Sequence, residues 1–478
     1  MKNNKIYIIL MLVVISCSPY MQAQCYPNQI VTSTFATGGN GLYLNKIVWL
    51  TWGANNQSHT YGLSNQTLQN GETSYASINL GGNKYFCLQA TLKNITPNAP
   101  IQSYIPGNYT GDSLDDLYNI GGAGTNNQMV SGIKNENSGS TSRFSVECKA
   151  FLDGNPVRLK GLVVADAESL ASSEEIKASA NGEWKIVEVK KNLNAGAYRA
   201  EKTQNGTEQQ IRFYQGNDNN TAAISILSFS ENAYATEAND YAVEFNVEIK
   251  GSGLTAIALG IILPEVDGGD ALEIYGNPLH IIDKTSFNDD QIALNSPKNL
   301  NTSNYQPAQE VQVTNLSHIG SEIPDTDQST QYSIDALGDD NDGGSINEED
   351  ALPAELKRFS HENFNYKAEE NFEMQVPYYA LKASFLQGWI DFNLNGVFET
   401  SEGVMVEVPA GTGTATLNWV VPNDVVLAPT YVRLRLSENY YGNLTPEATL
   451  LKGEIEDHRM YVVKPVLVNP SIPSVIQE

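Results

Sequence analysis

The periodic segments of the chain alternate hydrophobic and polar residues with a period of two. Residues 241–249, 414–420 and 431–436 are clear examples. Such alternation is typical of β-strands that bury one face. Turn-forming pairs rich in Gly, Asn, Asp and Pro separate these segments, and helical patterns are short. The pattern predicts an all-β protein built from β-sandwiches.

Shifts in composition along the chain predict its domain organisation. Residues 28–262 form one long β-rich region, and residues 353–464 form a second. Between them, residues 263–352 are polar and end in an acidic, glycine-rich stretch. We therefore expect two β-sandwich (jelly-roll-like) domains joined by a polar acidic linker, followed by an extended tail at 465–478.

Residues 1–24 have the pattern of a signal peptide. Lys2 and Lys5 precede an apolar run that is too short to span a bilayer, and a more polar stretch follows. Cleavage near Gln24 is one interpretation. A lipobox-like sequence that ends at Cys17 supports another, in which the protein is a lipoprotein anchored through that residue. We find no longer apolar run, so we expect an exported protein, secreted or at the cell surface, without a transmembrane helix.

The charge balance narrows the range of partners. The 478 residues include 29 Lys and Arg but 55 Asp and Glu, which gives a net charge of −26. Nucleic acids and anionic membranes attract clustered basic residues, so this balance argues against both as partners. Divalent cations remain suitable ligands, because carboxylate oxygens bind them well.

Export to an oxidising compartment allows disulfides among the four cysteines, Cys17, Cys25, Cys87 and Cys148. Cys87 and Cys148 both lie in strand-like runs, so a disulfide between them is one interpretation. Two buried free thiols are the alternative, because free cysteine commonly behaves as a small buried hydrophobic residue.

The sequence from Asp391 to Glu402 carries the sharpest chemical signal. It fits the pattern D-x-[DN]-x-[DN]-G-x5-E of a calcium-binding loop, and Gly396 stands where the chain must turn sharply. The expected ligands supply oxygen atoms from side chains or a carbonyl, and they are Asp391, Asn393, Asn395, Val397, Glu399 and Glu402. The flanks have strand patterns, so we expect Ca²⁺ in a loop without EF-hand helices. An Asn-Gly hairpin without metal is the alternative.

Catalytic motifs are absent from the sequence. The chain has five histidines but no metalloprotease, nucleophile-elbow or phosphate-loop motif. Trp49 and Trp52, which we place on one face of a strand, are expected in the core rather than in a sugar-stacking surface. We therefore expect no enzymatic activity, although a glycosidase-like carboxylate pair stays open because acidic residues are abundant.

Three segments resemble known families. Gly453-Glu454-Ile455-Glu456-Asp457 resembles the motif that names the GEVED domain of bacterial secreted proteins, and the resemblance covers residues 355–464. His458 stands where that family more often has tyrosine. The segment from Tyr43 to Gly53, with Tyr109-Thr110-Gly111-Asp112 and Tyr118, resembles the non-repetitive ligand-binding domain of CshA-type surface adhesins. Residues 267–280 resemble, in degenerate form, the segment that often joins these two modules.

The resemblance implies an adhesin-like function. The expected partner is a host or matrix glycan or protein, bound by a lectin-like first domain, with a calcium-stabilised second domain. Two alternatives are a secreted hydrolase that carries the GEVED domain as an accessory module, and a structural component of a surface layer.

The GEVED-like motif leaves its own chemistry open. Glu454, Glu456 and Asp457 are favoured as ion-pair partners of Arg433 and Arg435, which share one face of a strand. Because the motif is shared by the family, a metal site formed by the three acids is the alternative.

Overall fold

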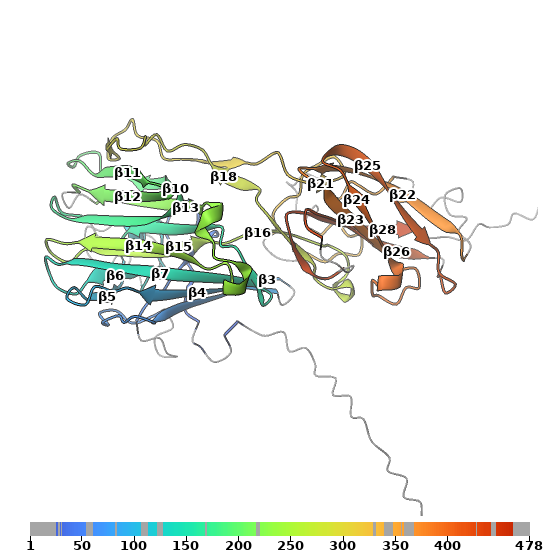
Figure 1. The fold of residues 1–478 in the computed structure, drawn as a ribbon, viewed down its shortest axis with the longest axis horizontal. Coiled ribbons are helices and arrows are strands. Elements are labelled where there is room, and N and C mark those ends of the chain that lie inside the picture. Colours follow the sequence, from blue (N-terminus) through green and yellow to red (C-terminus); the bar gives the residue numbers. More distant parts are fainter. Residues whose placement is uncertain are drawn as a thin grey trace, which may run out of the picture.

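The structure is a computed structural model, and it confirms an all-β, multi-domain fold (Figure 1). It describes residues 25–26, 29, 31–53, 61–81, 84–106, 113–121, 128–167, 170–216, 220–327, 331–338, 348–354, 356–357, 368–426, 428–440 and 446–461. Within these ranges the one α-helix is the single turn α1 (Leu114–Leu117). Short 3-10 turns are η1 (Glu231–Ala233), η2 (Glu237–Asn239), η3 (Glu273–Tyr275) and η5 (Thr400–Glu402).

The first domain is a sandwich of two antiparallel sheets that share the long strand β10 (Glu175–Lys190). The first half of β10 pairs with β12 and β14, and its second half pairs with β13. The change occurs at Gly182, where an added Cβ would lie 2.2 Å from the carbonyl oxygen of Ser228. Only glycine allows the backbones to approach this closely.

Both sheets of the first domain are built from strands distant in sequence. The first sheet runs in the order β3 (Thr73–Gly81), β4 (Lys84–Lys93), β7 (Thr141–Leu152), β14 (Val243–Lys250), β10, β12 (Glu208–Tyr214) and β11 (Arg199–Asn205), with β8 (Asn155–Val157) beside β7. The second runs in the order β1 (Thr34–Phe35), β2 (Ile47–Trp49), β15 (Ala256–Ile262), β9 (Gly161–Asp166), β13 (Ala222–Phe229) and β10, with β6 (Gly132–Asn135) and β5 (Ile101–Tyr104) beside β15.

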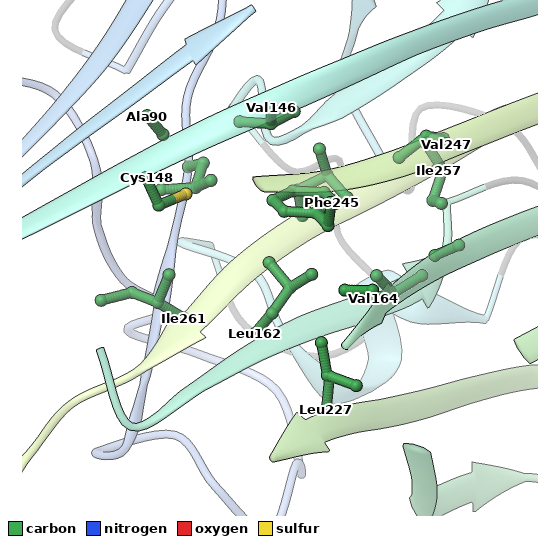
Figure 2. Close-up of a cluster of buried hydrophobic side chains, with 14 of the residues drawn as sticks. Ala90, Val146, Cys148, Leu162, Val164, Leu227, Phe245, Val247, Ile257 and Ile261 are labelled. Carbon is green, nitrogen blue, oxygen red and sulfur yellow. The ribbon is translucent and has the colours of Figure 1, made fainter. Parts of the chain in front are cut away.

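The core of the first domain lies between these sheets. Figure 2 shows Phe245 and Val146 of the first sheet facing Leu162, Val164 and other aliphatic side chains of the second sheet. All of them are almost fully buried. Burying one such side chain stabilises the fold by about 1.5–3 kcal/mol.

Trp49 and Trp52 are both in the core, as predicted, each with 1% of its surface exposed. Their placement on one face is wrong. Trp52 packs between the sheets, whereas Trp49 packs on the outer side of the second sheet against Tyr118. Residues three apart in an extended chain point to opposite sides, because the side-chain period is two.

Of the two interpretations of Cys87 and Cys148, the disulfide between them is wrong, and the alternative of two buried free thiols holds for Cys148 alone. Cys87 is bonded to Cys25, with 5.7 Å between their Cα atoms, and Cys148 is a buried free thiol. Cys148 lies opposite Ala90 in the pairing of β7 with β4, and both face the core. Cys87 is three residues from Ala90 on β4, so it points to the outer side of the sheet, away from Cys148.

The second domain is a smaller sandwich. One sheet contains β21 (His318–Ile319), β22 (Asn371–Ala380) and β25 (Gly411–Val420). The other runs in the order β24 (Gly403–Val408), β23 (Ser384–Ile390), β26 (Pro429–Ser437) and β28 (Gly453–Tyr461). Phe372, Leu417, Leu386 and Leu434 form part of the core between them. The alternation predicted for 414–420 and 431–436 therefore lies on two facing sheets.

The segment predicted as a polar linker, 263–352, contains strands in its described part. β16 (Glu265–Gly268) and β17 (Leu279–Ile282) form a small sheet with β27 (Thr449–Leu451) of the second domain. The chain then returns to the first domain, where β18 (Thr285–Phe287) pairs with β20 (Glu310–Gln312), and β19 (Lys298–Asn299) pairs with β11. It reaches the second domain again at β21.

These returns carry the segment along both domains (Figure 1). Asp290 of the segment forms a buried ion pair of 2.8 Å with Lys202 of β11. Val266 and Leu279 extend the core of the first domain. The described part of the polar segment therefore packs against both domains, because polar composition also suits a segment whose side chains pair with both neighbours.

Several predicted features lie outside the described residues. They are the signal sequence with Cys17, the tail at 465–478, Tyr109 to Asp112, and most of the acidic stretch, 339–347. Across the described residues, no helix has the length and apolar character that a membrane crossing requires.

Candidate functional site

The outer face of the first sheet is the polar face of the first domain. Along β14, Val243, Phe245 and Val247 point inward and are buried, whereas Glu244 and Asn246 are exposed. The alternation predicted for residues 241–249 therefore places polar side chains on the outer face.

A chain of ion pairs crosses this face over four neighbouring strands. Arg143 Nε lies 2.6 Å from Glu248 Oε2, and Lys177 Nζ lies 2.6 Å from Glu248 Oε1. Lys177 Nζ also lies 2.9 Å from Glu175 Oε1, and Arg212 Nε donates to Glu175 Oε2 at 2.8 Å. Each partner restrains the next, so the charged groups are held in set positions.

A cavity of about 330 Å³ opens on this face. Its lining combines amide, hydroxyl and charged groups, and the residues are Asn94, Arg143, Phe144, Lys177, Ser179, Gln210, Asn246, Val247 and Glu248. The groups supply both hydrogen-bond donors and acceptors, which suits a polar ligand such as a glycan or a protein surface. The sequence analysis did not identify these residues.

The two carboxyl groups in this chain of ion pairs, Glu175 and Glu248, are not suited to acid catalysis. Burial acts to raise the pKa of Glu248, but the hydrogen bond and charge of Lys177, with Arg143, lower it below the ordinary value. Lys177 and Arg212 likewise outweigh burial and lower the pKa of Glu175. A glycosidase acid needs a raised pKa, so neither Glu175 nor Glu248 has the property of such an acid.

The predicted calcium loop connects β23 to β24 and ends in the turn η5. Leu394 and Gly396 adopt positive φ angles of 59° and 80°, which produce the sharp turn. The Asn393 Oδ1 atom accepts a hydrogen bond of 2.9 Å from Asn395 N, and Asn395 Oδ1 accepts one of 2.9 Å from Val397 N. The strand flanks of the loop are as predicted.

The acidic side chains of the loop gather at its base. The Asp391 carboxylate is buried and accepts hydrogen bonds from Gly396 N at 3.0 Å and from the Tyr275 hydroxyl at 2.7 Å. Glu402 accepts a bond of 2.8 Å from Phe392 N and one of 3.2 Å from Glu399 N. The predicted side-chain ligands thus lie in one compact loop.

Burial and the neighbouring carboxylates both act on the pKa of Glu402. Burial, with the negative charges of Asp391 and Glu399, raises the pKa of Glu402 to about 7. Hydrogen bonds from the backbone oppose this change without cancelling it. A proton or a cation would relieve the crowding.

The outer side of the GEVED-like strand β28 binds the segment between the two domains, residues 263–352, which we call the connecting segment. Asp457 forms a two-bond ion pair with Arg433 of β26, with both N–O distances 2.7 Å and both side chains fully buried. Asp457 Oδ2 also accepts a hydrogen bond of 3.0 Å from Ala271 N. Arg433 Nη1 donates to the Tyr275 carbonyl at 2.8 Å. The pair therefore attaches residues 271–275 to the second domain.

The inner side of β28 carries Glu454, Glu456 and His458, spaced two residues apart. Glu454 accepts a hydrogen bond from Ile319 N, and Glu456 accepts one of 2.9 Å from Ala351 N. Both bonds hold parts of the segment that arrives from the first domain. The ion pairing predicted for the motif is confirmed for Asp457 but is wrong for the two glutamates, which point to the opposite side of the strand from Arg433.

The glycine of the motif has a steric role. Gly453 has a φ of 146°, and an added Cβ would lie 1.8 Å from the carbonyl oxygen of Leu436. Any other residue would separate β28 from β26 at this point.

The fold and these sites define a multi-domain, all-β protein with an exposed polar face. Residues 45–263 match the family model of surface adhesin CshA non-repetitive domain 2, and residues 385–461 match the GEVED domain. The chain therefore contains a region that matches the CshA-type adhesin domain and a region that matches the GEVED domain, as the resemblance predicted. The first match supports a surface adhesin-like role rather than an enzymatic one.

Solved structures add little to these matches. The N-terminal domain of the Streptococcus gordonii adhesin Sgo0707 is 9% identical, with a TM-score of 0.30, and the match covers 91% of this chain and 96% of that one. A biofilm associated protein BSP domain is 8% identical, with a TM-score of 0.13, and the match covers 83% and 77%. Neither likeness is high enough to carry an argument. No curated protein gives a significant match.

Proposed function

We propose that this protein is an adhesin-like ligand-binding protein that acts at the cell surface or after secretion, and that its ligand is a host or matrix glycan or protein. The observation that carries the proposal is the match of residues 45–263 to the CshA adhesin domain. The cavity on the outer face of the first sheet supports it, because its amide, hydroxyl and charged groups are already oriented by neighbouring strands.

The chain without residues 1–24 tests the proposal on arrays of glycans and matrix proteins. Ser179→Trp fills the cavity, and the expected result is at least a tenfold loss of affinity for the ligand that the array identifies. Thr207→Trp is the matched control, because Thr207 lines a second cavity of about 550 Å³ elsewhere on the domain. Circular dichroism shows whether both variants keep the β fold.

Each outcome separates the hypotheses. Binding lost in Ser179→Trp and retained in Thr207→Trp supports the cavity as the ligand site. Equal binding by both variants places the ligand elsewhere. Cleavage of an arrayed molecule favours the hydrolase, and no binding at all removes the main support for an adhesin.

We also propose that the loop from Asp391 to Glu402 binds Ca²⁺ and stabilises the second domain. The spacing of its oxygen ligands supports this, as do the crowded carboxylates at its base. Few of the ligands are anionic, so the affinity should lie near the weak end for such loops, with a Kd of about 10⁻⁴–10⁻³ M.

A further inference from the structure

A second group of potential metal ligands lies inside the second domain, apart from the calcium loop. Glu349, Glu456 and His458 each place a ligand atom within 4.8 Å of the other two. His458 Nε2 lies 2.7 Å from Glu456 Oε2, and His458 Nδ1 lies 3.7 Å from Glu349 Oε2. Glu456 and His458 share one face of β28, whereas Glu349 belongs to the connecting segment.

These side chains are buried and incompletely satisfied. The exposed fractions of Glu349, Glu456 and His458 are 2%, 0% and 2%. Within the part of the chain that the structure describes, Glu349 Oε2 and Glu456 Oε1 have no hydrogen-bond partner, and neither has Glu454 Oε1 on the same face of β28. A buried carboxylate oxygen without a partner is costly, so each such atom in a folded protein calls for an explanation.

Among the described residues, no lysine or arginine forms an ion pair with Glu349 or Glu456. Arg433 lies on the other side of the sheet, paired with Asp457. The Lys357 ammonium donates to the backbone carbonyl of Glu349 at 2.6 Å. Both ring nitrogens of His458 face carboxylate oxygens, and a neutral imidazole nitrogen is a common metal ligand.

The geometry points to a site for one divalent transition-metal ion of the zinc type, and we propose Glu349, Glu456 and His458 as its protein ligands. Imidazole nitrogen with carboxylate oxygen suits zinc or a similar ion, whereas calcium and magnesium prefer oxygen alone. Because two ligands come from β28 and one from residue 349, the ion stabilises the attachment of the connecting segment to the second domain.

The site differs from the shared features of the GEVED domain. The family resemblance leads one to expect tyrosine at position 458, so the imidazole ligand belongs to this chain rather than to the motif. The third ligand, Glu349, lies before the region that matches the GEVED model. The proposal also does not depend on adhesion, because it concerns only the second domain and its attachment.

Metal uptake during refolding tests the proposal, because the site is closed to solvent in the folded protein. The chain without residues 1–24 is unfolded with chelator, refolded with Zn²⁺, with Co²⁺ or without metal, and then freed of excess metal. The expected result is about one tightly held ion per chain by mass spectrometry of metals, and a higher Tm than in the metal-free sample. The Co²⁺ form should show the visible absorption of a cobalt site with nitrogen and oxygen ligands.

Two variants make the assignment specific. His458→Tyr restores the residue common in the family, and it should fold but hold almost no metal. Glu402→Gln changes the calcium loop and should retain the ion. A wild-type chain that refolds without bound metal overturns the proposal, as does His458→Tyr with unchanged metal content. If His458→Tyr does not fold, the cobalt spectrum of the wild-type chain decides. A wild-type spectrum without nitrogen coordination also overturns the proposal.

Discussion

Arg433 and Asp457 form a fully buried ion pair across β26 and β28, with two hydrogen bonds of 2.7 Å. Both side chains also bind the connecting segment, at Ala271 N and at the Tyr275 carbonyl. The pair therefore links the GEVED motif to a part of the chain about 180 residues earlier in the sequence.

Removing one member of this pair should strongly destabilise the second domain. In Asp457→Ala the Arg433 guanidinium stays buried without its carboxylate, which typically costs about 3–5 kcal/mol. Urea unfolding followed by tryptophan fluorescence measures the loss. Lys382→Ala is the control, because the Lys382 side chain is largely exposed and its pair with Glu438 is 3.4 Å long. Glu438 keeps its hydrogen bond from the Ser317 hydroxyl, so the variant should lose only about 1 kcal/mol. Similar small losses in both variants would contradict a structural role for the buried pair.

Calcium should raise the thermal stability of the second domain. At about 100 times Kd, a bound ion adds roughly 2.7 kcal/mol to the free energy of unfolding. Glu402→Gln should remove most of the difference in Tm between calcium and chelator, because it removes an anionic ligand. Glu407→Gln, on the exposed face of the next strand, should leave the difference unchanged. If calorimetry finds the same Tm in calcium and in chelator, the calcium hypothesis is wrong and the loop is a hairpin without bound metal.

In chelator, the pH dependence of the free energy of unfolding should show the titration of Glu402. Its pKa is about 7 in the folded chain and near 4.5 ordinarily, so between these values the folded chain keeps a proton that the unfolded chain releases. The Glu402 contribution is fully present below pH 4.5 and is lost as pH rises through 7. Urea titrations should therefore show a loss of stability over this window that is absent from Glu402→Gln. A wild-type and a variant curve with the same slope would refute the assignment.

The Cys25–Cys87 disulfide should stabilise the first domain by about 2–5 kcal/mol. Peptide mapping without reduction should find this pair linked and Cys148 unmodified. Burial raises the pKa of the Cys148 thiol to about 12, so it should react with a thiol reagent only after unfolding. Cys87→Ser should lower the free energy of unfolding by removing the disulfide. Cys148→Ala should lower it only through the lost packing contacts of the buried thiol. A linked Cys87–Cys148 peptide would contradict the pairing.

Local features of this protein could be predicted from its sequence. The alternation in residues 241–249 indicated both a strand and its polar side, because the period of side chains along a strand depends only on the chain itself. The loop from Asp391 to Glu402 was recognisable for the same reason, since all its candidate ligands lie within twelve residues. The GEVED motif also marked a strand whose glycine is required by close backbone approach.

Only the tertiary structure decided which of these segments meet. Arg143, Lys177 and Glu248 form one surface because β7, β14 and β10 are neighbours, and Glu349 meets His458 because a segment of the predicted linker returns to β28. Cys87 bonds to Cys25 because the sheet separates it from Cys148. The alternation of a strand shows that it has a buried face, but its neighbours depend on the packing of many side chains distant in sequence.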